Sequence, residues 1–305
     1  MGKLDAVVVG GAAVDLVAQV DELPQRDSLV LARAFGRFPG GSAANVAVGL
    51  ARLGRRVGFV GKLGDDEHGQ LLLAAFEQEG VDTRGVIVET GRPTATCFIA
   101  VDGRGERMIV ALPGAAIIEN IAELDLDYVR GARAVYIGPS YPGVALAAAA
   151  AVRESEGAVF CAPGGGWGPD GLAQLGPVLE RVDVLLVSRA EAAEWTGLAS
   201  PAEAIRQLGR MGPPVVIQTL GAEGALVLAN GRMTEVPAFP GPPARDTTGA
   251  GDAFAAGLIA GFLEGLDWEE AARMGCAAAA LKIRHVGARS GLPGREEIQS
   301  WGGVL

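Results

Sequence analysis

A turn of small residues, Asp246-Thr247-Thr248-Gly249-Ala250-Gly251-Asp252, leads into the apolar helical stretch Ala253–Ile259. The first amides of a helix have no partner within the helix, and the helix dipole makes that end electropositive. Such a turn is suited to binding a phosphate group. Phosphoryl transfer to an alcohol would use the carboxylate too, since the amides of 249–251 stabilise the moving charge while Asp252 takes the proton. A plain capping turn is the alternative, because Asp and Thr are common helix caps.

A second motif of small residues, Pro39-Gly40-Gly41-Ser42-Ala43-Ala44-Asn45, also precedes a stretch with helical spacing. Adjacent glycines let a ligand approach the backbone closely. The Asn45 amide can both donate and accept hydrogen bonds, as recognition of a sugar hydroxyl requires. Asp15 follows the first apolar strand, at the end where open α/β sheets bind ligands. Each could also be only a turn or a cap, and Gly10-Gly11 lacks the G-x-G-x-x-G pattern of a dinucleotide site.

Together the two motifs resemble the signatures of the ribokinase-like (PfkB) carbohydrate kinases. The resemblance runs in order from Gly10 to about Pro293. It implies an α/β fold with three layers (α/β/α), a mostly parallel central sheet and a small β-sheet lid. It also implies an ATP-dependent kinase that uses Mg²⁺ to phosphorylate a hydroxyl of a small sugar, with Asp252 as general base and the 249–252 turn as anion hole. Because the transition state is loose, a weak base suffices. Asp252 therefore needs no raised pKa, since the helix N-terminus would keep it ionised.

The resemblance assigns roles to further residues of this chain. The expected sugar contacts are Asp15, Gly40, Gly41, Ser42, Asn45 and Asp252. The expected nucleotide contacts are Ser188, Glu191, Thr219, Gly221, Ala222, Glu223, Gly224, Gly251 and Cys276, with Gly287–Arg289 in the loop beyond the adenine. Glu191 would hold Mg²⁺ through water, and Ser188 replaces the family's usual Asn with a shorter side chain, so that a water fills the gap. A monovalent cation such as K⁺ is expected at Asp246, Thr248, Ile283, Val286 and Ala288, mostly through backbone carbonyls.

The identity of the acceptor alcohol stays open at the level of sequence. Ser42 occupies the position where ribokinase-type sites usually carry Lys, and Gly138–Tyr141 holds no acidic sugar contact. Ribose is therefore disfavoured, whereas nucleosides, ketohexoses and 2-keto-3-deoxy sugar acids remain candidates. A nucleoside kinase of the same fold and a non-catalytic sugar- or nucleotide-binding relic are the alternative functions.

The composition of the chain restricts the cellular compartment and the binding partners that we expect for the protein. The 305 residues carry a formal net charge of −10, which argues against a nucleic-acid partner. Three cysteines, Cys97, Cys161 and Cys276, lack metal-type spacing and suit a reducing compartment. The apolar start is too short for a signal peptide and Val144–Val152 is too short to span a bilayer. We therefore expect a cytoplasmic protein without a membrane partner.

The elements that position these motifs alternate between strand and helix, as in a parallel sheet covered on both faces. Expected strands are Asp5–Gly10, Arg56–Gly61, Ala134–Ile137, Ala158–Cys161, Val184–Val187, Val215–Thr219 and Leu226–Leu228. Expected helices are Ala43–Leu53, Asp66–Glu79, Gly143–Glu156, Ala190–Thr196, Pro201–Met211, Ala253–Glu264 and Trp268–Arg284.

We expect residues 1–305 to form a single domain, with a lid built from segments near 15–37 and 86–112. The candidate lid strands are Leu29–Arg37, Val86–Val88, Ala95–Val101 and Arg107–Leu112. Asp102-Gly103 predicts a hairpin between the last two, flanked by Arg104 and Arg107 as solvated charges that could reach a substrate anion. The apolar alternation in Ala95–Val101 is compatible with the homodimer through the lid that the resemblance implies.

Overall fold

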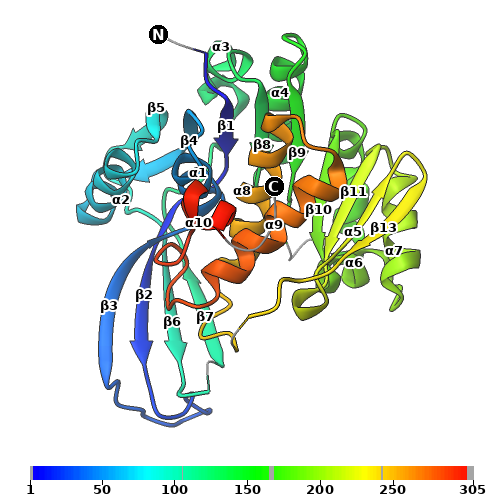
Figure 1. The fold of residues 1–305 in the computed structure, drawn as a ribbon. Helices are drawn as coiled ribbons and strands as arrows, with labels where there is room; N and C mark the ends of the chain where they lie inside the picture. Colours follow the sequence, from blue (N-terminus) through cyan, green and yellow to red (C-terminus); the bar gives the residue numbers. More distant parts are fainter. Residues whose placement is uncertain (1–2, 105, 165–167, 242, 301–305) are drawn as a thin grey trace.

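Nine strands form one central sheet within residues 3–104, 106–164, 168–241 and 243–300, which the computed structural model describes (Figure 1). Their order across the sheet is β13-β12-β11-β10-β9-β8-β1-β4-β5. The bounds are β1 Ala6–Val9, β4 Val57–Gly64, β5 Asp82–Glu89, β8 Ala134–Ile137, β9 Ala158–Cys161, β10 Val184–Ser188, β11 Val215–Thr219, β12 Ala225–Ala229 and β13 Arg232–Val236. Neighbouring strands are parallel except where β12 pairs with β11 and with β13, so the prediction of a mostly parallel sheet is confirmed.

Helices cover both faces of this sheet and complete three layers (Figure 1). One face carries α1 Ser42–Arg52, α2 Glu67–Gln78, α8 Ala250–Glu264, α9 Trp268–Lys282 and α10 Arg295–Ser300. The other face carries α3 Leu126–Arg130, α4 Pro142–Arg153, α5 Gly168–Leu179, α6 Arg189–Thr196 and α7 Pro201–Gly209. Strand β1 shows why both faces are apolar, because Ala6 and Val8 pack into one core while Val7 and Val9 pack into the other.

A second sheet of four described strands, in the order β3-β2-β6-β7, extends away from the central one (Figure 1). Its bounds are β2 Ala13–Gln19, β3 Ala34–Gly40, β6 Thr96–Val101 and β7 Arg107–Leu112. We call it the small sheet. Strand β3 of the small sheet ends at Gly40, in the glycine-rich loop that precedes α1, so the small sheet and the candidate sugar-binding residues are directly connected in the chain.

Two predicted lid strands differ from the structure. The strand expected at Leu29–Arg37 begins only at Ala34, and Leu29 and Leu31 before it are solvent-exposed. The segment Val86–Val88 belongs to β5, which pairs in parallel with β4 at the edge of the central sheet rather than in the small sheet. As an edge strand, β5 is only partly buried, with Val86 packed against one core and Ile87 against the other, so its pattern resembles that of a lid strand.

Several elements were not predicted. Helix α5 contains Pro177 and several glycines, which lower helix propensity, and it forms because its apolar residues pack into the second core. The strand β13 follows Asn230-Gly231, both with positive φ, which is the two-residue hairpin turn that the sequence itself signals. The short helices α3 and α10 complete this set, and η1 Ile121–Glu123 and η2 Gly221–Glu223 are single 3₁₀ turns. None of the described helices is long and apolar enough to span a bilayer.

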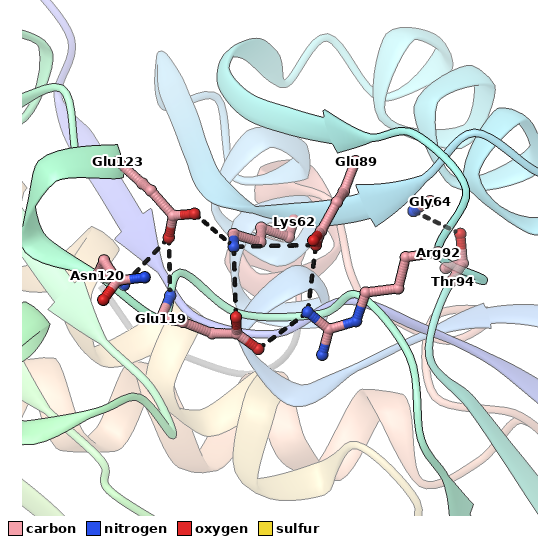
Figure 2. A network of polar contacts seen from close by, with 8 residues as sticks. All are labelled: Lys62, Gly64, Glu89, Arg92, Thr94, Glu119, Asn120 and Glu123. Atoms are coloured by element: carbon pink, nitrogen blue, oxygen red, sulfur yellow. Dashed lines mark hydrogen bonds and ion pairs between the residues drawn. The ribbon is translucent and has the colours of Figure 1, made fainter.

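A cluster of charges anchors the small sheet to the central sheet (Figure 2). Lys62 at the end of β4 is buried, and its ammonium lies 2.7 Å from Glu123, 3.6 Å from Glu119 and 3.9 Å from Glu89. Arg92 bridges Glu89 and Glu119. These glutamates lie on the two chain segments that lead into β6 and out of β7, so one buried cation ties both segments to β4 (Figure 2).

Replacing the buried cation should therefore destabilise the fold strongly. Lys62→Met leaves three carboxylates facing one another around an apolar side chain, and we expect the free energy of unfolding to fall by about 3 kcal/mol. Urea denaturation measures this loss. Arg84→Met is the matched control, because Arg84 pairs with Asp82 at the solvent-exposed surface and should cost far less. Equal losses in the two variants would contradict the anchoring role of Lys62.

Candidate active site

The predicted anion-binding turn forms the N-terminal end of α8. Gly249 precedes the helix with a φ of 79°, in the left-handed region that favours glycine. A Cβ at this position would lie 2.7 Å from the carbonyl oxygen of Ala288, so any other residue would push the two loops apart. The amide of Ala250 donates to the carbonyl of Thr247 and closes the turn ahead of the helix. Gly251 and Asp252 then follow in the first turn of α8.

Asp252 lies against the second predicted motif. Ser42 Oγ donates to Asp252 Oδ1 at 2.6 Å, and Asn45 Nδ2 donates to Asp252 Oδ2 at 2.7 Å. Burial raises the pKa of the Asp252 carboxyl above its ordinary value, while these two hydrogen bonds act in the opposite direction. The proposed chemistry does not require a raised pKa at Asp252, and the loss of solvent around the carboxylate raises it nevertheless.

A buried arginine orients Asn45. Arg289 Nε donates to Asn45 Oδ1 at 2.8 Å, and its Nη2 donates to the carbonyl of Gly40 at 2.9 Å. Because Asn45 Oδ1 accepts from this guanidinium, the amide nitrogen must point toward Asp252. Burial lowers the pKa of Arg289 to about 10, which keeps the side chain charged at neutral pH. The resemblance implies that this loop lies beyond the adenine, and the structure shows in addition that Arg289 contacts two of the predicted sugar-binding residues, Asn45 and Gly40.

Asp15 lies beside the same loop. It is in β2 opposite Phe38 of β3, and a Cβ on Gly40 would come within 2.3 Å of its Oδ2, so Gly40 leaves room for the carboxylate. Burial raises the pKa of Asp15 to about 6, against the opposing charge of Arg289. A cavity of about 540 Å³ opens between the small sheet and the loops 244–248 and 286–288. Its lining includes Asp15, Phe38, Ile99, Asp246, Thr248 and Ala288.

Arg107 connects the small sheet to the turn before α8 across this cavity. Its Nη1 donates to Thr248 Oγ1 at 2.7 Å and lies 3.9 Å from Asp246 Oδ1. The sequence interpretation treated Arg107 as a strand-edge charge that could reach an anion. The structure shows that β7 brings it to within hydrogen-bonding distance of the turn that precedes the helix.

Seven of the predicted nucleotide residues lie at or just beyond the carboxyl ends of β10 and β11, whereas Gly251 lies in α8 and Cys276 in α9. Ser188 and Thr219 are partners in register, and Arg189 forms a 2.7 Å ion pair with Glu223. Ser188 and Glu191 form a capping box at the start of α6, in which the Ser188 amide donates to Glu191 Oε2 at 2.7 Å. Gly221, Ala222, Glu223 and Gly224 form the η2 turn and its end.

Tyr136 links the two groups of residues and was not selected from the sequence. It is buried in β8, and burial raises its pKa, with the charges of both Asp252 and Glu191 acting in the same direction. An isolated tyrosine in an apolar strand carries no motif, so only the fold could identify it. Cys276 is buried in α9, and burial raises the pKa of its thiol to about 11.

The residues present fit a water-bound Mg²⁺. No cluster of three or more His, Cys, Asp or Glu residues that could hold a metal occurs in the part of the chain that the structure describes. Mg²⁺ keeps several waters and is often bound by one carboxylate together with substrate phosphates. Glu191 offers such a carboxylate, with one oxygen anchored by the Ser188 amide.

Two of the groups expected to bind a monovalent cation, the Asp246 carboxylate and the Ile283 carbonyl, already accept hydrogen bonds within the protein. Both carboxylate oxygens of Asp246 accept backbone amides, from Thr248 at 2.8 Å and from Gly287 at 2.7 Å. The Ile283 carbonyl accepts the amides of Arg245 and Asp246. The Asp246 carbonyl accepts the ammonium of Lys282, a side chain that the sequence interpretation did not select.

The raised pKa of Asp15 has a consequence for stability. The pKa of Asp15 is about 6 in the folded protein against an ordinary value of 3.8, so the folded state binds this proton more tightly than the unfolded chain does. The stability that the protonated Asp15 contributes to the fold is therefore present at low pH and is lost as the pH rises through 6. Asp15→Asn should therefore match the wild type near pH 4 and exceed its free energy of unfolding by about 3 kcal/mol at pH 7. Urea denaturation across this range is the measurement. Asp127→Asn, at an exposed site, is the control, and a flat difference for Asp15→Asn would contradict the assignment.

Comparison with known proteins identifies the family. The chain matches the model of the pfkB family carbohydrate kinases over residues 3–295. It is 35% identical to the ATP-dependent ribose-1-phosphate kinase of Halopiger xanaduensis, over 90% of each chain, and 30% identical to the ribokinase of Bacillus subtilis, over 96% of this chain and 97% of the other. The structure of Arabidopsis thaliana ribokinase complexed with ribose and ATP superposes with a TM-score of 0.87 at 27% identity, covering 99% of both chains. The protein therefore belongs to the PfkB family of carbohydrate kinases.

Proposed function

We propose that this kinase transfers the γ-phosphoryl group of ATP to a hydroxyl of a small sugar or sugar-like alcohol, with Asp252 as general base. The observation that carries the proposal is the contact of Asp252, in the first turn of α8, with Ser42 and Asn45 at the start of α1. A carboxylate held at a helix N-terminus and beside hydroxyl-binding groups has an anion site on one side and an alcohol site on the other.

The proposed reaction uses both sides of Asp252. The acceptor hydroxyl takes the place of Ser42 or Asn45 as a hydrogen-bond donor to the carboxylate, which then accepts the proton as the phosphoryl group arrives. The raised pKa favours this role, because a stronger base accepts a proton more readily. The N-terminal amides of α8, which include Gly251, stabilise charge on the transferring group.

The nucleotide would lie along the ends of β10 and β11, on Ser188, Thr219 and the η2 turn. Cys276 of α9 would lie near the adenine, where a small side chain leaves room for a flat base. Mg²⁺, when bound, would neutralise charge on the β- and γ-phosphates. Glu191 would hold its waters, and the capping bond from Ser188 fixes the carboxylate in that position.

The small sheet would act as a lid over the acceptor. Arg107 already joins β7 to Thr248 across the cavity, so the sheet and the helix N-terminus enclose the space that Asp15 lines. Enclosure excludes water, which would otherwise compete with the alcohol for the phosphoryl group. The relatives named for ribose 1-phosphate and ribose favour a sugar over a nucleoside as acceptor.

Asp252→Asn tests the base directly. The variant should keep the fold and its affinity for ATP, because asparagine preserves the shape of the site. It should lose turnover by about two to four orders of magnitude, because the amide cannot accept the proton. ADP release with the best acceptor from a panel of sugars and nucleosides measures turnover. Asp127→Asn is the surface control, and near-wild-type turnover in Asp252→Asn would contradict the assignment.

We also propose that a second copy of the chain docks on the small sheet. Its edge strand β7 exposes Met108, Ile109, Val110 and Leu112, with no charge among them. An uncharged apolar edge can pair with itself about a twofold axis without like-charge repulsion. Contact between two lids would also explain why so much apolar surface lies on an otherwise small element.

Val110→Glu should convert the dimer into a monomer, because two carboxylates would then face each other at the contact. Val110 does not line the cavity, so the acceptor site should remain intact. Sedimentation velocity measures the mass. Val88→Glu, at a similarly exposed valine on the edge strand β5, should leave the dimer unchanged. A monomeric wild type at micromolar concentration would contradict the proposal.

A cytoplasmic location remains part of the proposal. The cysteines Cys97, Cys161 and Cys276 are all free thiols in the described structure. Free thiols in apolar surroundings are typical of proteins from reducing compartments.

A further inference from the structure

Lys282 is a buried cation at a point where the sequence is otherwise apolar. It is the last residue of α9, follows Ala277–Leu281, and has no exposed surface. Its Nζ donates to the carbonyl oxygen of Asp246 at 2.9 Å and to that of His285 at 3.4 Å. A buried ammonium is costly unless its donors are satisfied, so these two carbonyls define its position.

The two carbonyls belong to loops that meet beneath the N-terminus of α8. The amides of Arg245 and Asp246 both donate to the Ile283 carbonyl, and the Gly287 amide donates to the Asp246 carboxylate. The same second loop ends at Ala288, whose carbonyl faces Gly249. Lys282 therefore places a positive charge at the junction that sets the shape of the proposed anion hole.

The surroundings of this charge resemble the oxygen shell of a monovalent cation. Carbonyl oxygens are the groups that replace the hydration shell of K⁺ in proteins. Here they contact an ammonium. Burial lowers the pKa of Lys282, while the carboxylates of Asp246 and Asp252 act in the opposite direction and favour its charge. Arg107 adds a second positive group on the other side of Asp246. A further cation at this junction would be repelled by both charges.

We propose that Lys282 is a built-in substitute for the monovalent cation that the family resemblance implies at this junction. The ammonium holds the loops 245–248 and 283–288 together, so the anion hole keeps its shape without an added ion. Lys282 acts as a positioning residue, because it contacts the loops and not the substrate. The role of Lys282 rests on the proposed function only in the experiments that measure activity. Experiments that measure thermal stability test it independently of that function.

The wild-type protein gives the first arm of the test. Thermal unfolding is followed in KCl, NaCl and tetramethylammonium chloride at equal ionic strength, together with ADP release. An ion that binds only the folded state raises the melting temperature in a saturable manner. We expect no difference among the three salts in either measurement. A saturable rise in melting temperature or turnover with K⁺ would overturn the proposal.

The second arm uses Lys282→Met, which keeps an apolar side chain of similar length and removes the charge. The variant should melt at a lower temperature and turn over more slowly in tetramethylammonium, and both should recover as K⁺ or NH₄⁺ is added. Binding of Tl⁺, followed by ²⁰⁵Tl NMR, should appear in the variant and be absent from the wild type. Arg273→Met, at an exposed position on the same helix, should show no response to cations.

The outcomes separate the two proposals. If Lys282→Met folds and its melting temperature does not change with K⁺, the proposal that Lys282 substitutes for a cation is overturned. If the variant folds only in KCl, this dependence on K⁺ supports the proposal that Lys282 substitutes for a cation. Absence of turnover from every protein in every salt would contradict the proposed function, and the melting temperatures and Tl⁺ binding would still decide the role of Lys282.

Discussion

The hydrogen bonds from Ser42 and Asn45 to Asp252 join parts of the chain that are 210 and 207 residues apart. They require the N-termini of α1 and α8 to lie side by side on one face of the central sheet. The apolar residues of both helices pack into a single core, which supplies this constraint. An alcohol site and an anion site consequently share one carboxylate. Neither helix alone could perform the proposed reaction, since each provides only one of these two sites.

The buried polar and charged groups of the site are positioned by buried cations that lie next to them. Arg289 supports Asn45 and faces Asp15, while Lys282 lies under the turn that leads to Asp252. Burial disfavours every one of these charges, and a protein selected for stability alone would replace them. Their presence around Asp252 indicates that the fold sacrifices stability to keep ionised groups in place for chemistry.

The sequence predicted the central sheet and the main site because their signals are local. Strand–helix alternation and the Gly-rich turns before α1 and α8 need no tertiary information. The positions of Arg289, Lys282 and Tyr136 could not be predicted in the same way, because each acts through neighbours distant in the chain. The start of β3 was misplaced for a related reason, since exposed leucines before Ala34 imitate a strand pattern. The sequence feature that could have singled out Lys282 is its position as a charged residue at the end of an apolar helical run.

The most direct test of the central claim is acceptor-dependent release of ADP from ATP across a panel of sugars, sugar phosphates, sugar acids and nucleosides. ³¹P NMR of the products would locate the transferred phosphate. The account predicts that at least one alcohol accelerates ADP release and appears as its phosphate ester in equal amount. Release of inorganic phosphate without esterification of any acceptor, or no ADP release at all, would contradict it.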